Sequence, residues 1–323
     1  MKGFRIGGYV PEYRKHVLTG TIGHSILSRL NEIYLFSIEV DEKTGYLKET
    51  DRILSSMDKN GETIVSDLRK GGGGGRLGAH VVVGGAGRSR SFDKIARNVK
   101  KTRQFGIALR QFCMKHHLKG VIIDWEGPFS NVRFEAMLKR IKVQLKELEL
   151  GVALHTWNPL KHYEDVDTVH VMAYDMIRDR GHSLMRDTRE AVNAILASGA
   201  PPKKIVLGIP AYCRALSNPG LVKTFEEVVR EADLWDGGDI VTIDGVEYGC
   251  NSFATVAEKA AYASERGLGG VFFWELGQDA VRSDYALTLA VHAGIETSSL
   301  RSAALDAENR ARRSRGSGVK GEL

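Results

Sequence analysis

The chain alternates short runs of apolar and β-branched residues with longer segments in which apolar residues recur at helical spacing. Eight apolar runs predict β-strands: Phe4–Tyr9, Glu32–Val40, His80–Val83, Gly120–Trp125, Leu150–Thr156, Thr168–Tyr174, Ile205–Ile209 and Gly270–Trp274. The segments with helical spacing include Phe92–Lys115, Ser130–Glu149, Ser183–Ser198 and Phe253–Arg266. Strands that are apolar throughout are typical of a parallel sheet covered by helices. Eight of them, separated by helices, favour an α/β fold closed into a (β/α)8 TIM barrel over an open doubly wound sheet.

The length of 323 residues fits such a barrel as a single domain. We expect the barrel to occupy residues 1–297. Residues 298–323 are rich in Arg, Ser and Gly and predict a basic, partly disordered tail. Five consecutive glycines, Gly71–Gly75, predict a flexible surface loop, and this run lacks the Gly-Lys-Ser/Thr ending of a phosphate-binding loop.

Composition and charge argue against several classes of protein. The net charge is +6, half of this excess lies in the tail, and no basic face with interleaved aromatics indicates nucleic-acid binding. No window approaches 18 consecutive apolar residues, so no membrane span is predicted. No signal-peptide-like apolar stretch follows Met1, so the expected location is cytoplasmic unless the chain has been trimmed. Cys113, Cys213 and Cys250 are odd in number and widely spaced, which predicts free thiols rather than disulfides.

The most informative chemistry lies at the end of the fourth predicted strand. Side chains alternate along a strand, so Ile122, Asp124 and Glu126 are expected to point to one side. Two carboxyl groups on one face of an apolar strand resist desolvation and repel each other, which raises the pKa of one of them. A carboxyl group kept protonated in this way can act as a general acid. The alternative is that both acids are simply solvated where the strand meets its loop.

Other predicted strands also carry polar and aromatic residues at their carboxyl ends, where the active sites of such barrels lie. Strand six ends in Tyr174 and Asp175, strand eight in Trp274, and strand one at Tyr9. The apolar face of a sugar ring packs well on an indole, so Trp274 predicts a carbohydrate site. Each of these residues alone also fits a purely structural role.

Several segments in order along the chain carry a family resemblance. Lys119 to Glu126 is similar to the motif Asp-Gly-x-Asp-x-Asp-x-Glu, and Met172 to Asp175 is similar to Met-x-Tyr-Asp. Gly208 to Arg214, Gly269 to Glu275 and Val81 to Gly85 are similar to the strand-seven, strand-eight and strand-three motifs of the same family. The chain thus resembles glycoside hydrolase family 18, the chitinases and related endo-N-acetylglucosaminidases, from about Phe4 to Ala293.

The resemblance implies retaining, substrate-assisted hydrolysis of β-1,4 linkages next to N-acetylglucosamine, with an oligo- or polysaccharide as the partner and no metal or organic cofactor. Glu126 is the implied proton donor, Asp124 orients the substrate's acetamido group, and Tyr174 hydrogen-bonds its carbonyl oxygen. The residues expected to bind the substrate are Tyr9, Phe36, Trp125, Met172, Asp175, Tyr212, Arg214 and Trp274.

Three positions depart from the family pattern. Lys119 and Ile122 replace the first and middle aspartates of the strand-four motif, and Val82 stands where serine is usual. The middle aspartate shares a proton with the acid at the position of Asp124, so its loss predicts weakened or pH-shifted activity. The segment between Arg214 and Gly269 has room for a hairpin and a helix but not for a large α+β insertion, which predicts a shallow, open cleft.

Two other functions compete with this interpretation. The first is a non-catalytic chitooligosaccharide-binding lectin on the same barrel, suggested by the changes at Ile122 and Val82. The second is a barrel enzyme acting on phosphorylated metabolites, suggested by Gly71–Gly75 and Gly84–Gly87, but the loops after strands seven and eight offer no glycine-rich nest for phosphate. The sequence leaves open which N-acetylglucosamine polymer is bound and whether cleavage is internal or terminal.

Overall fold

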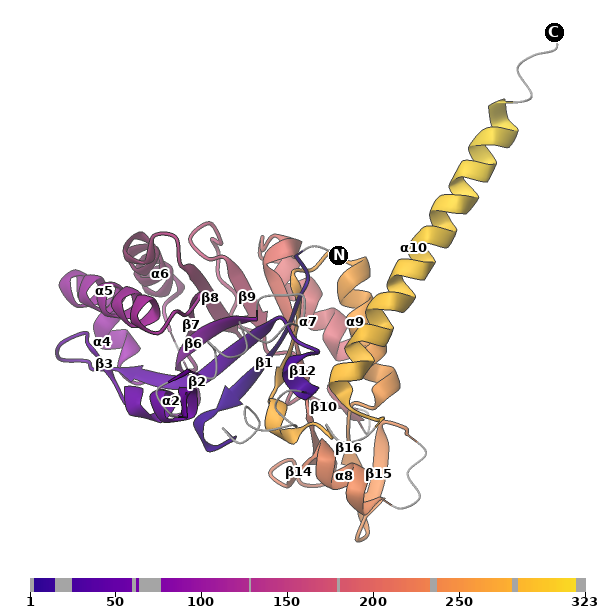
Figure 1. Ribbon diagram of the computed structural model, residues 1–323, viewed down its shortest axis with the longest axis horizontal. Helices are drawn as coiled ribbons and strands as arrows, with labels where there is room; N and C mark the ends of the chain where they lie inside the picture. Colours follow the sequence, from indigo (N-terminus) through magenta and orange to yellow (C-terminus); the bar gives the residue numbers. More distant parts are fainter. Residues whose placement is uncertain are drawn as a thin grey trace.

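The computed structural model describes residues 3–14, 25–59, 62–63, 77–127, 129–178, 181–232, 237–280 and 284–317. Eight parallel strands form a closed barrel (Figure 1): β1 (Arg5–Pro11), β2 (Glu32–Val40), β6 (Gly78–Gly84), β7 (Gly120–Asp124), β8 (Glu149–Leu154), β9 (Thr168–Val171), β12 (Ile205–Pro210) and β17 (Gly270–Trp274). Pairing of β1 with both β17 and β2 closes the ring. The predicted TIM barrel is therefore confirmed, as is each of the eight strands. The glycine run Gly71–Gly75 lies outside the described residues.

Side-chain alternation divides the apolar core into two layers. The outer layer lies between the strands and the surrounding helices, and a smaller inner cluster fills the barrel. The buried members of the inner cluster are Tyr9, Tyr34, Phe36, Val82, Ile122, Ala153, Met172, Val206 and Phe272. Each strand is therefore buried on both faces, which is why its sequence reads as a continuous apolar run.

Helices surround the barrel: α2 (Thr50–Met57), α4 (Phe92–Ala96), α5 (Val99–Lys115), α6 (Asn131–Leu145), α7 (Met185–Ala197), α8 (Phe225–Glu231), α9 (Phe253–Glu265) and α10 (Leu287–Ser317). Two short 3-10 turns are Pro202–Lys204 and Leu276–Gln278. The predicted helix Phe92–Lys115 is in fact two helices. Asn98 separates them, because its extended backbone ends α4 and its side chain accepts a hydrogen bond from Lys101 N at 3.0 Å to cap α5.

The segment that connects β12 to β17 in the sequence forms a small antiparallel sheet, which lies next to α8 (Figure 1). Its strands are β13 (Tyr212–Ala215), β14 (Val222–Thr224), β15 (Ile240–Ile243) and β16 (Val246–Gly249). The predicted hairpin and helix are thus present, and the insertion stays small. Short pairings elsewhere involve β3 (Leu47–Lys48), β4 (Asp58–Lys59), β5 (Glu62–Thr63), β10 (Ile177–Arg178) and β11 (Gly181–His182).

The prediction of three free thiols is wrong. Cys213 of β13 and Cys250 at the end of β16 form a disulfide, with their Cα atoms 4.4 Å apart, while Cys113 is a buried free thiol. The two cysteines are 37 residues apart in sequence and meet because β13 pairs with β16. Only the sheet in the insertion brings them together, and the sequence spacing carries no sign of it.

The predicted tail also differs in structure, because α10 continues through residues 298–317. Figure 1 shows α10 lying along α9 and then extending away from the barrel. Close packing of Gly294 on Ala257 and an ion pair between Arg301 and Glu265 at 3.1 Å fix the first part. Beyond it the sequence is rich in Ala and Arg, which are strong helix formers.

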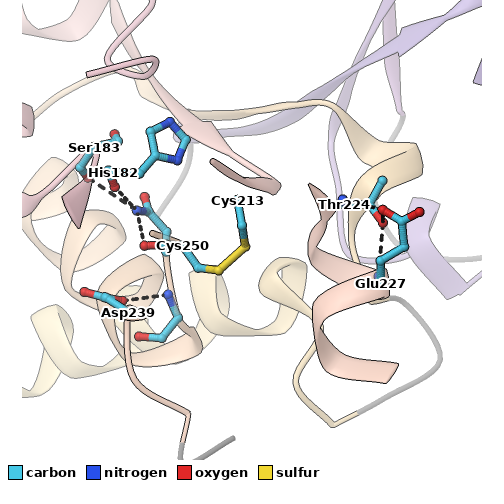
Figure 2. Close-up of a disulfide and its surroundings, with 9 residues drawn as sticks. His182, Ser183, Cys213, Thr224, Glu227, Asp239 and Cys250 are labelled. Carbon is cyan, nitrogen blue, oxygen red and sulfur yellow. Dashed lines mark hydrogen bonds between the residues drawn. A yellow bond between two sulfur atoms is a disulfide. The ribbon is translucent and has the colours of Figure 1, made fainter. Parts of the chain in front are cut away.

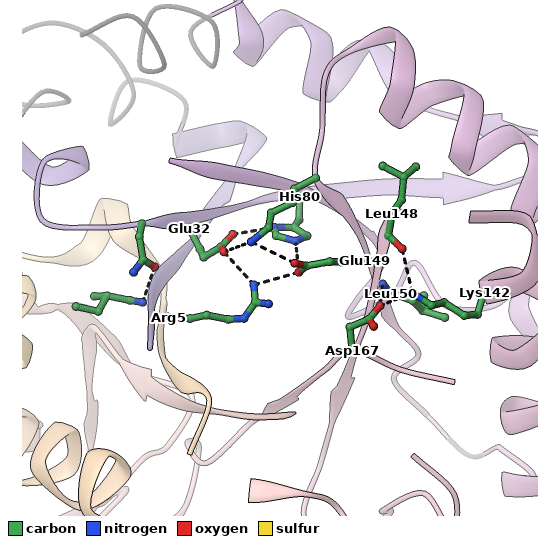
Figure 3. A network of polar contacts seen from close by, with 11 residues as sticks. Arg5, Glu32, His80, Lys142, Leu148, Glu149, Leu150 and Asp167 are labelled. Carbon is green, nitrogen blue, oxygen red and sulfur yellow. Dashed lines mark hydrogen bonds and ion pairs between the residues drawn. The ribbon is translucent and has the colours of Figure 1, made fainter. Parts of the chain in front are cut away.

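The end of the barrel at which the strands begin is closed by a network of ion pairs (Figure 3). The buried carboxylate of Glu32 contacts Arg5 at 2.9 Å, Lys119 at 2.7 Å and His80 at 3.2 Å. Glu149 contacts the same three cationic groups. Burial alone raises the pKa of Glu32, but its contacts with His80 and Lys119 outweigh this and hold the pKa below its ordinary value. In this network each carboxylate is therefore paired with cationic side chains.

Two negative findings apply to the described part of the chain. None of its helices combines the length and the apolarity needed to cross a membrane. Within the same residues, no group of His, Cys, Asp and Glu side chains is arranged to hold a metal ion.

Candidate active site

The two acids of the fourth strand lie at the opposite end of the barrel, where β7 ends. Ile122 belongs to the inner cluster, and Asp124, two residues further along, is also buried. Glu126 follows just beyond the strand and is half-buried. The charge of Glu126 acts on the pKa of Asp124, so the two carboxyl groups lie near each other. A common face for both side chains remains what alternation along the strand predicts.

Trp125 does not share this placement. It is buried between the strand and the helices, with its ring 5.6 Å from that of Phe92 and 5.2 Å from that of Phe134. The expectation that Trp125 contacts substrate therefore has no support in its position. The reason is the alternation itself, because a residue between two inward-facing acids must face outward.

Asp124 is a buried acid that forms no ion pair with any residue that the structure describes. Its Oδ1 atom has no hydrogen-bond partner among the described residues. Burial raises the pKa of Asp124 well above its ordinary value, and the neighbouring charge of Glu126 raises it further. The turn after β6 allows the acid to fit, because Gly84 and Gly85 adopt positive φ angles of 100° and 94°. A Cβ on Gly84 would lie 2.3 Å from the carbonyl oxygen of Asp124, so this close approach requires glycine.

Glu126 is also adapted to hold a proton. Burial raises its pKa, the charge of Asp175 acts in the same direction, and a backbone hydrogen bond from Ala86 opposes them. Ser89 fixes the backbone at this point: its hydroxyl accepts from Glu126 N at 3.0 Å and lies 3.0 Å from the carbonyl oxygen of Asp124. Ser89 was not predicted from the sequence, because a serine in a loop gives no sign of a contact 37 residues away.

Asp175 is the centre of a second polar group at the mouth of the barrel. Its Oδ1 atom accepts a hydrogen bond from the hydroxyl of Tyr212, and Arg214 Nη2 lies 2.6 Å from the same atom. Asp175 has a positive φ of 63°, and its backbone N–H donates to Nε2 of His182 at 3.3 Å. Of the predicted residues, Asp175, Tyr212 and Arg214 are thus brought into direct contact.

Aromatic side chains line the interior below these polar groups. The ring of Trp274 lies 4.8 Å from that of Phe36 and 5.4 Å from that of Tyr9. Tyr174 packs edge-on against Phe272. Burial raises the pKa of Tyr174, and the charges of Asp124 and Asp175 act in the same direction. Met172 is buried in the same inner cluster. The predicted residues Tyr9, Phe36, Met172, Tyr174 and Trp274 therefore lie together.

Below this layer the barrel contains a histidine that was not predicted. The hydroxyl of Tyr9 is 3.1 Å from Nδ1 of His170, and both side chains are buried. Burial lowers the pKa of His170 well below its ordinary value, so the imidazole is neutral. The sequence shows His170 only as one polar residue within an otherwise apolar strand, which does not indicate a role in the site. Glu275, beside Trp274, was also missed: it is buried, and burial raises its pKa to about 7.

His182, which contacts Asp175, belongs to a buried polar network, part of which Figure 2 shows. Asn251 donates to the carbonyl oxygen of His182 at 2.8 Å, and Lys259 Nζ donates to Oδ1 of Asn251 at 2.6 Å and to the carbonyl oxygen of Ser183 at 2.5 Å. Figure 2 shows the disulfide of Cys213 beside this network. Since Cys213 lies between Tyr212 and Arg214, the disulfide holds the backbone that presents both partners of Asp175.

The three departures from the family pattern have separate structural settings. Lys119 lies at the far end of the barrel and pairs with Glu32, so its side chain has no part in the mouth. Val82 and Ile122, in contrast, are register partners on β6 and β7 and are both fully buried in the inner cluster. The two changes thus act together and make the layer below Asp124 apolar.

The fold and this site define a class of (β/α)8-barrel proteins with a carboxyl-lined, aromatic mouth. The family model described as "Glycosyl hydrolases family 18" matches residues 75–279. The chain therefore belongs to glycoside hydrolase family 18. Among curated relatives, it is 24% identical over 272 residues to "Chitinase 1" of Aphanocladium album, which covers 66% of this chain and 64% of the relative. The chain thus spans somewhat less than two thirds of that relative's length.

Solved structures of this family share the fold over nearly their whole length. The GH18 chitinase ChiB of Flavobacterium johnsoniae superposes with a TM-score of 0.73 at 20% identity, covering 91% of this chain and 94% of that one. The chitinase-like agglutinin RobpsCRA of Robinia pseudoacacia superposes with a TM-score of 0.71 at 19% identity, covering 90% and 99%. At these identities the likeness shows the fold alone, which both a chitinase and an agglutinin possess.

Proposed function

We propose that the protein hydrolyses β-1,4 linkages next to N-acetylglucosamine in chitin or chitooligosaccharides. One observation supports the proposal: Asp124 and Glu126 lie where β7 ends, the charge of Glu126 acts on the pKa of Asp124, and burial raises the pKa of each. A protonated Glu126 is suited to donate a proton, and Asp124, once ionised, is suited to stabilise positive charge. The GH18 chitinase of Cycas revoluta, whose structure was solved in complex with (GlcNAc)3, supports the choice of ligand.

In the proposed reaction the substrate supplies its own nucleophile. Glu126 transfers its proton to the glycosidic oxygen, the bond from that oxygen to the anomeric carbon breaks, and the carbonyl oxygen of the 2-acetamido group bonds to the same carbon. The product is an oxazolinium ion, whose positive charge Asp124 stabilises. Tyr174 donates a hydrogen bond to the acetamido oxygen. Glu126, now a carboxylate, then removes a proton from a water molecule that attacks the anomeric carbon, which restores the acetamido group with retained configuration.

The remaining residues bind the sugar. Trp274 provides a flat apolar surface for the pyranose ring at the cleavage point. Asp175, held by Tyr212 and Arg214, presents a carboxylate for sugar hydroxyl or amide groups. Arg214 and Tyr212 both contact Oδ1 of Asp175, and among the described residues no hydrogen bond to Oδ2 is seen, so Oδ2 is suited to accept from substrate.

The experiment that tests the proposal compares the wild type with Glu126→Gln on chitotetraose and on a fluorogenic N-acetylglucosamine oligomer. We expect turnover by the wild type and a loss of kcat of about 10²–10⁴-fold in the variant, since amide nitrogen cannot donate as an acid. Product masses from chitin, peptidoglycan glycan and N-glycan core substrates then identify the polymer. Turnover that is equal in both proteins would contradict the proposal.

A lectin is the second candidate, and one observation favours it. Ile122 and Val82 leave Asp124 without the proton-sharing partner of the family pattern, and an agglutinin shares the fold. Background-level signal in both proteins, combined with binding of chitotetraose by both, would replace the hydrolase by the lectin.

A further inference from the structure

Lys259, on α9, is a fully buried cationic side chain that forms no ion pair within the part of the chain that the structure describes. Its Nζ atom donates instead to three neutral oxygen atoms: the carbonyl oxygen of Ser183 at 2.5 Å, the hydroxyl of Ser183 at 3.0 Å and Oδ1 of Asn251 at 2.6 Å. A buried ammonium group without an opposite charge beside it raises the free energy of the folded state. The group therefore indicates a role other than stability.

The charges around Lys259 act on it only from a distance. Carboxylates that influence its pKa lie on the elements packed around it: Glu258 on α9 itself, Asp187 on α7 and Asp239 in the segment before β15. Burial outweighs them and lowers the pKa of Lys259 to about 7. His182, on β11, is the neighbouring base: burial lowers its pKa to about 4, against the charge of Asp175 and together with that of Lys259. Lys259 thus exchanges its proton near neutral pH, while the imidazole stays neutral.

Ser183 holds the segment that carries two of the proposed site residues. Its hydroxyl donates to the carbonyl oxygen of Ala173 at 2.5 Å, and its backbone N–H donates to the carbonyl oxygen of Met176 at 2.8 Å. Tyr174 and Asp175 lie between these two points. Asp175 and Ser183 have positive φ angles of 63° and 53°, which side-chain-bearing residues rarely adopt and which persist only where the surroundings fix them. The two hydrogen bonds from Ser183 therefore fix this turn.

The protonation state of Lys259 determines the direction of the Ser183 hydroxyl. An ammonium group has three N–H donors and no acceptor, so Ser183 Oγ accepts from it and directs its own hydrogen to Ala173. A neutral amine has two N–H donors and one lone pair. This lone pair can accept the hydrogen of the Ser183 hydroxyl, and the carbonyl oxygen of Ala173 then loses its donor. The charged form alone secures the turn.

Asn251 forms a second connection from Lys259 to the same turn. Because the ammonium group only donates, Asn251 presents its oxygen to Lys259 and its Nδ2 to the carbonyl oxygen of His182, at 2.8 Å. Nε2 of the neutral His182 ring accepts from Asp175 N at 3.3 Å. Lys259 thus acts on both sides of the backbone that presents Asp175.

We propose that Lys259 is a positioning residue that acts through Ser183 and Asn251. Its ammonium group fixes the turn that presents Tyr174 and Asp175 to the substrate. This inference rests on the proposed hydrolase function and adds to it a residue that does not touch the sugar, since Lys259 is fully buried. The affected ligand is the chitooligosaccharide of the proposed reaction.

The first test measures the binding of chitotetraose to Glu126→Gln, in which turnover does not disturb the titration. Adding Lys259→Met should weaken binding at pH 6 about tenfold, the equivalent of one hydrogen bond to a charged group. Val256→Ala, which truncates a fully buried side chain of the same helix, is the matched control. It should lower the urea midpoint of unfolding and leave binding unchanged. Unchanged binding by Lys259→Met, or an equal loss in Val256→Ala, would overturn the proposal.

The second test uses pH and a smaller substitution, which also serves if Lys259→Met does not fold. Binding by Glu126→Gln should weaken about fivefold from pH 6 to pH 8.5, where Lys259 is neutral. Ser183→Ala removes the hydroxyl that responds to this proton, so it should bind weakly at both pH values. Asp124 and Glu275 titrate alike in both proteins, so the difference between the two pH profiles isolates Lys259. An equal pH dependence with and without Ser183→Ala would contradict the role of Lys259.

Turnover by the wild type keeps this inference apart from the hydrolase proposal. If the wild type does not hydrolyse chitotetraose but Lys259→Met weakens binding as expected, the hydrolase proposal fails and the positioning role stands. If the wild type is active and Lys259→Met changes neither affinity nor pH profile, the positioning role alone fails. Absence of chitotetraose binding by Glu126→Gln at both pH values would also rule it out.

Discussion

The two ends of the barrel carry the same kinds of acidic residue in opposite electrostatic settings. Where the strands begin, Glu32 and Glu149 lie among Arg5, His80 and Lys119, and these contacts outweigh burial and lower the pKa of both carboxyl groups. Where β7 ends, burial raises the pKa of Asp124 and of Glu126. Asp124 has no cationic partner there among the described residues. β7 thus runs from the end of the barrel where the acids have cationic partners to the end where, among the described residues, Asp124 has none.

This difference separates stability from chemistry within one fold. A paired carboxylate lowers the free energy of the folded state, whereas an unpaired buried carboxylate raises it and is ready to exchange a proton. The fold needs only paired carboxylates for its stability, so an unpaired buried carboxylate indicates a functional site. The comparison leads to three predictions beyond the tests above, and their expected effects decrease in the order given.

Asp124→Asn should reduce activity strongly and still preserve or increase stability. We expect kcat to fall by about 10²–10³-fold, since charge stabilisation at the oxazolinium is lost. The folded state holds the proton of Asp124 more tightly than the unfolded state, so the native acid costs stability once the pH exceeds its unfolded pKa. At pH 7 the variant should therefore gain on the order of 1 kcal/mol in unfolding free energy, and the gain should vanish near pH 3. Urea unfolding at both pH values measures this, and destabilisation at pH 7 would contradict it.

Glu32→Gln should lower the stability of the fold and leave the activity unchanged. The pKa of Glu32 is lowered in the folded state, so its contribution to stability is present above the unfolded pKa and is lost as the pH falls through the folded pKa. We expect a loss of about 1–3 kcal/mol at pH 7 because buried partners lose a charged acceptor, a smaller loss in acid, and an unchanged kcat/KM. The same urea titrations, with steady-state kinetics on chitotetraose, test both parts. A variant that keeps full stability but loses activity would reverse the assignment of the two ends.

Ile122→Asp should make the uncompensated end more like the usual family pattern. A protonated carboxyl at position 122 can donate a hydrogen bond to Asp124 and lower its pKa. In the proposed mechanism Asp124 must be ionised and Glu126 protonated, so the acid limb of the pH–rate profile for kcat/KM should move about one unit lower. Val82→Ser alone is the matched control on the neighbouring strand. A profile that coincides with that of the wild type would show that Asp124 does not depend on this layer.

How much of this could be predicted from the sequence depends on the range of the interactions. The eight strands follow from local apolar patterns, which the sequence displays directly, and the same alternation predicts a common face for Asp124 and Glu126. The error at Trp125 arose from giving a substrate-binding role to a position that the same alternation turns outward. Ser89, His170 and the Cys213–Cys250 pair depend on contacts between segments that are distant in sequence, so no local pattern predicts them. The helical course of residues 298–317 was missed because low hydrophobicity was taken for disorder, although the same residues favour a helix.

The disulfide has a consequence for handling the protein. Tyr212 and Arg214, which flank Cys213, are the side chains that hold Asp175. The position of Asp175, which we propose binds the sugar, is therefore tied to the redox state of the surroundings, although neither sulfur atom takes part in the proposed reaction. Material purified with a thiol reductant and material purified in air would then differ at the mouth of the barrel, and kinetic comparisons between preparations are meaningful only when the oxidation state of Cys250 is matched.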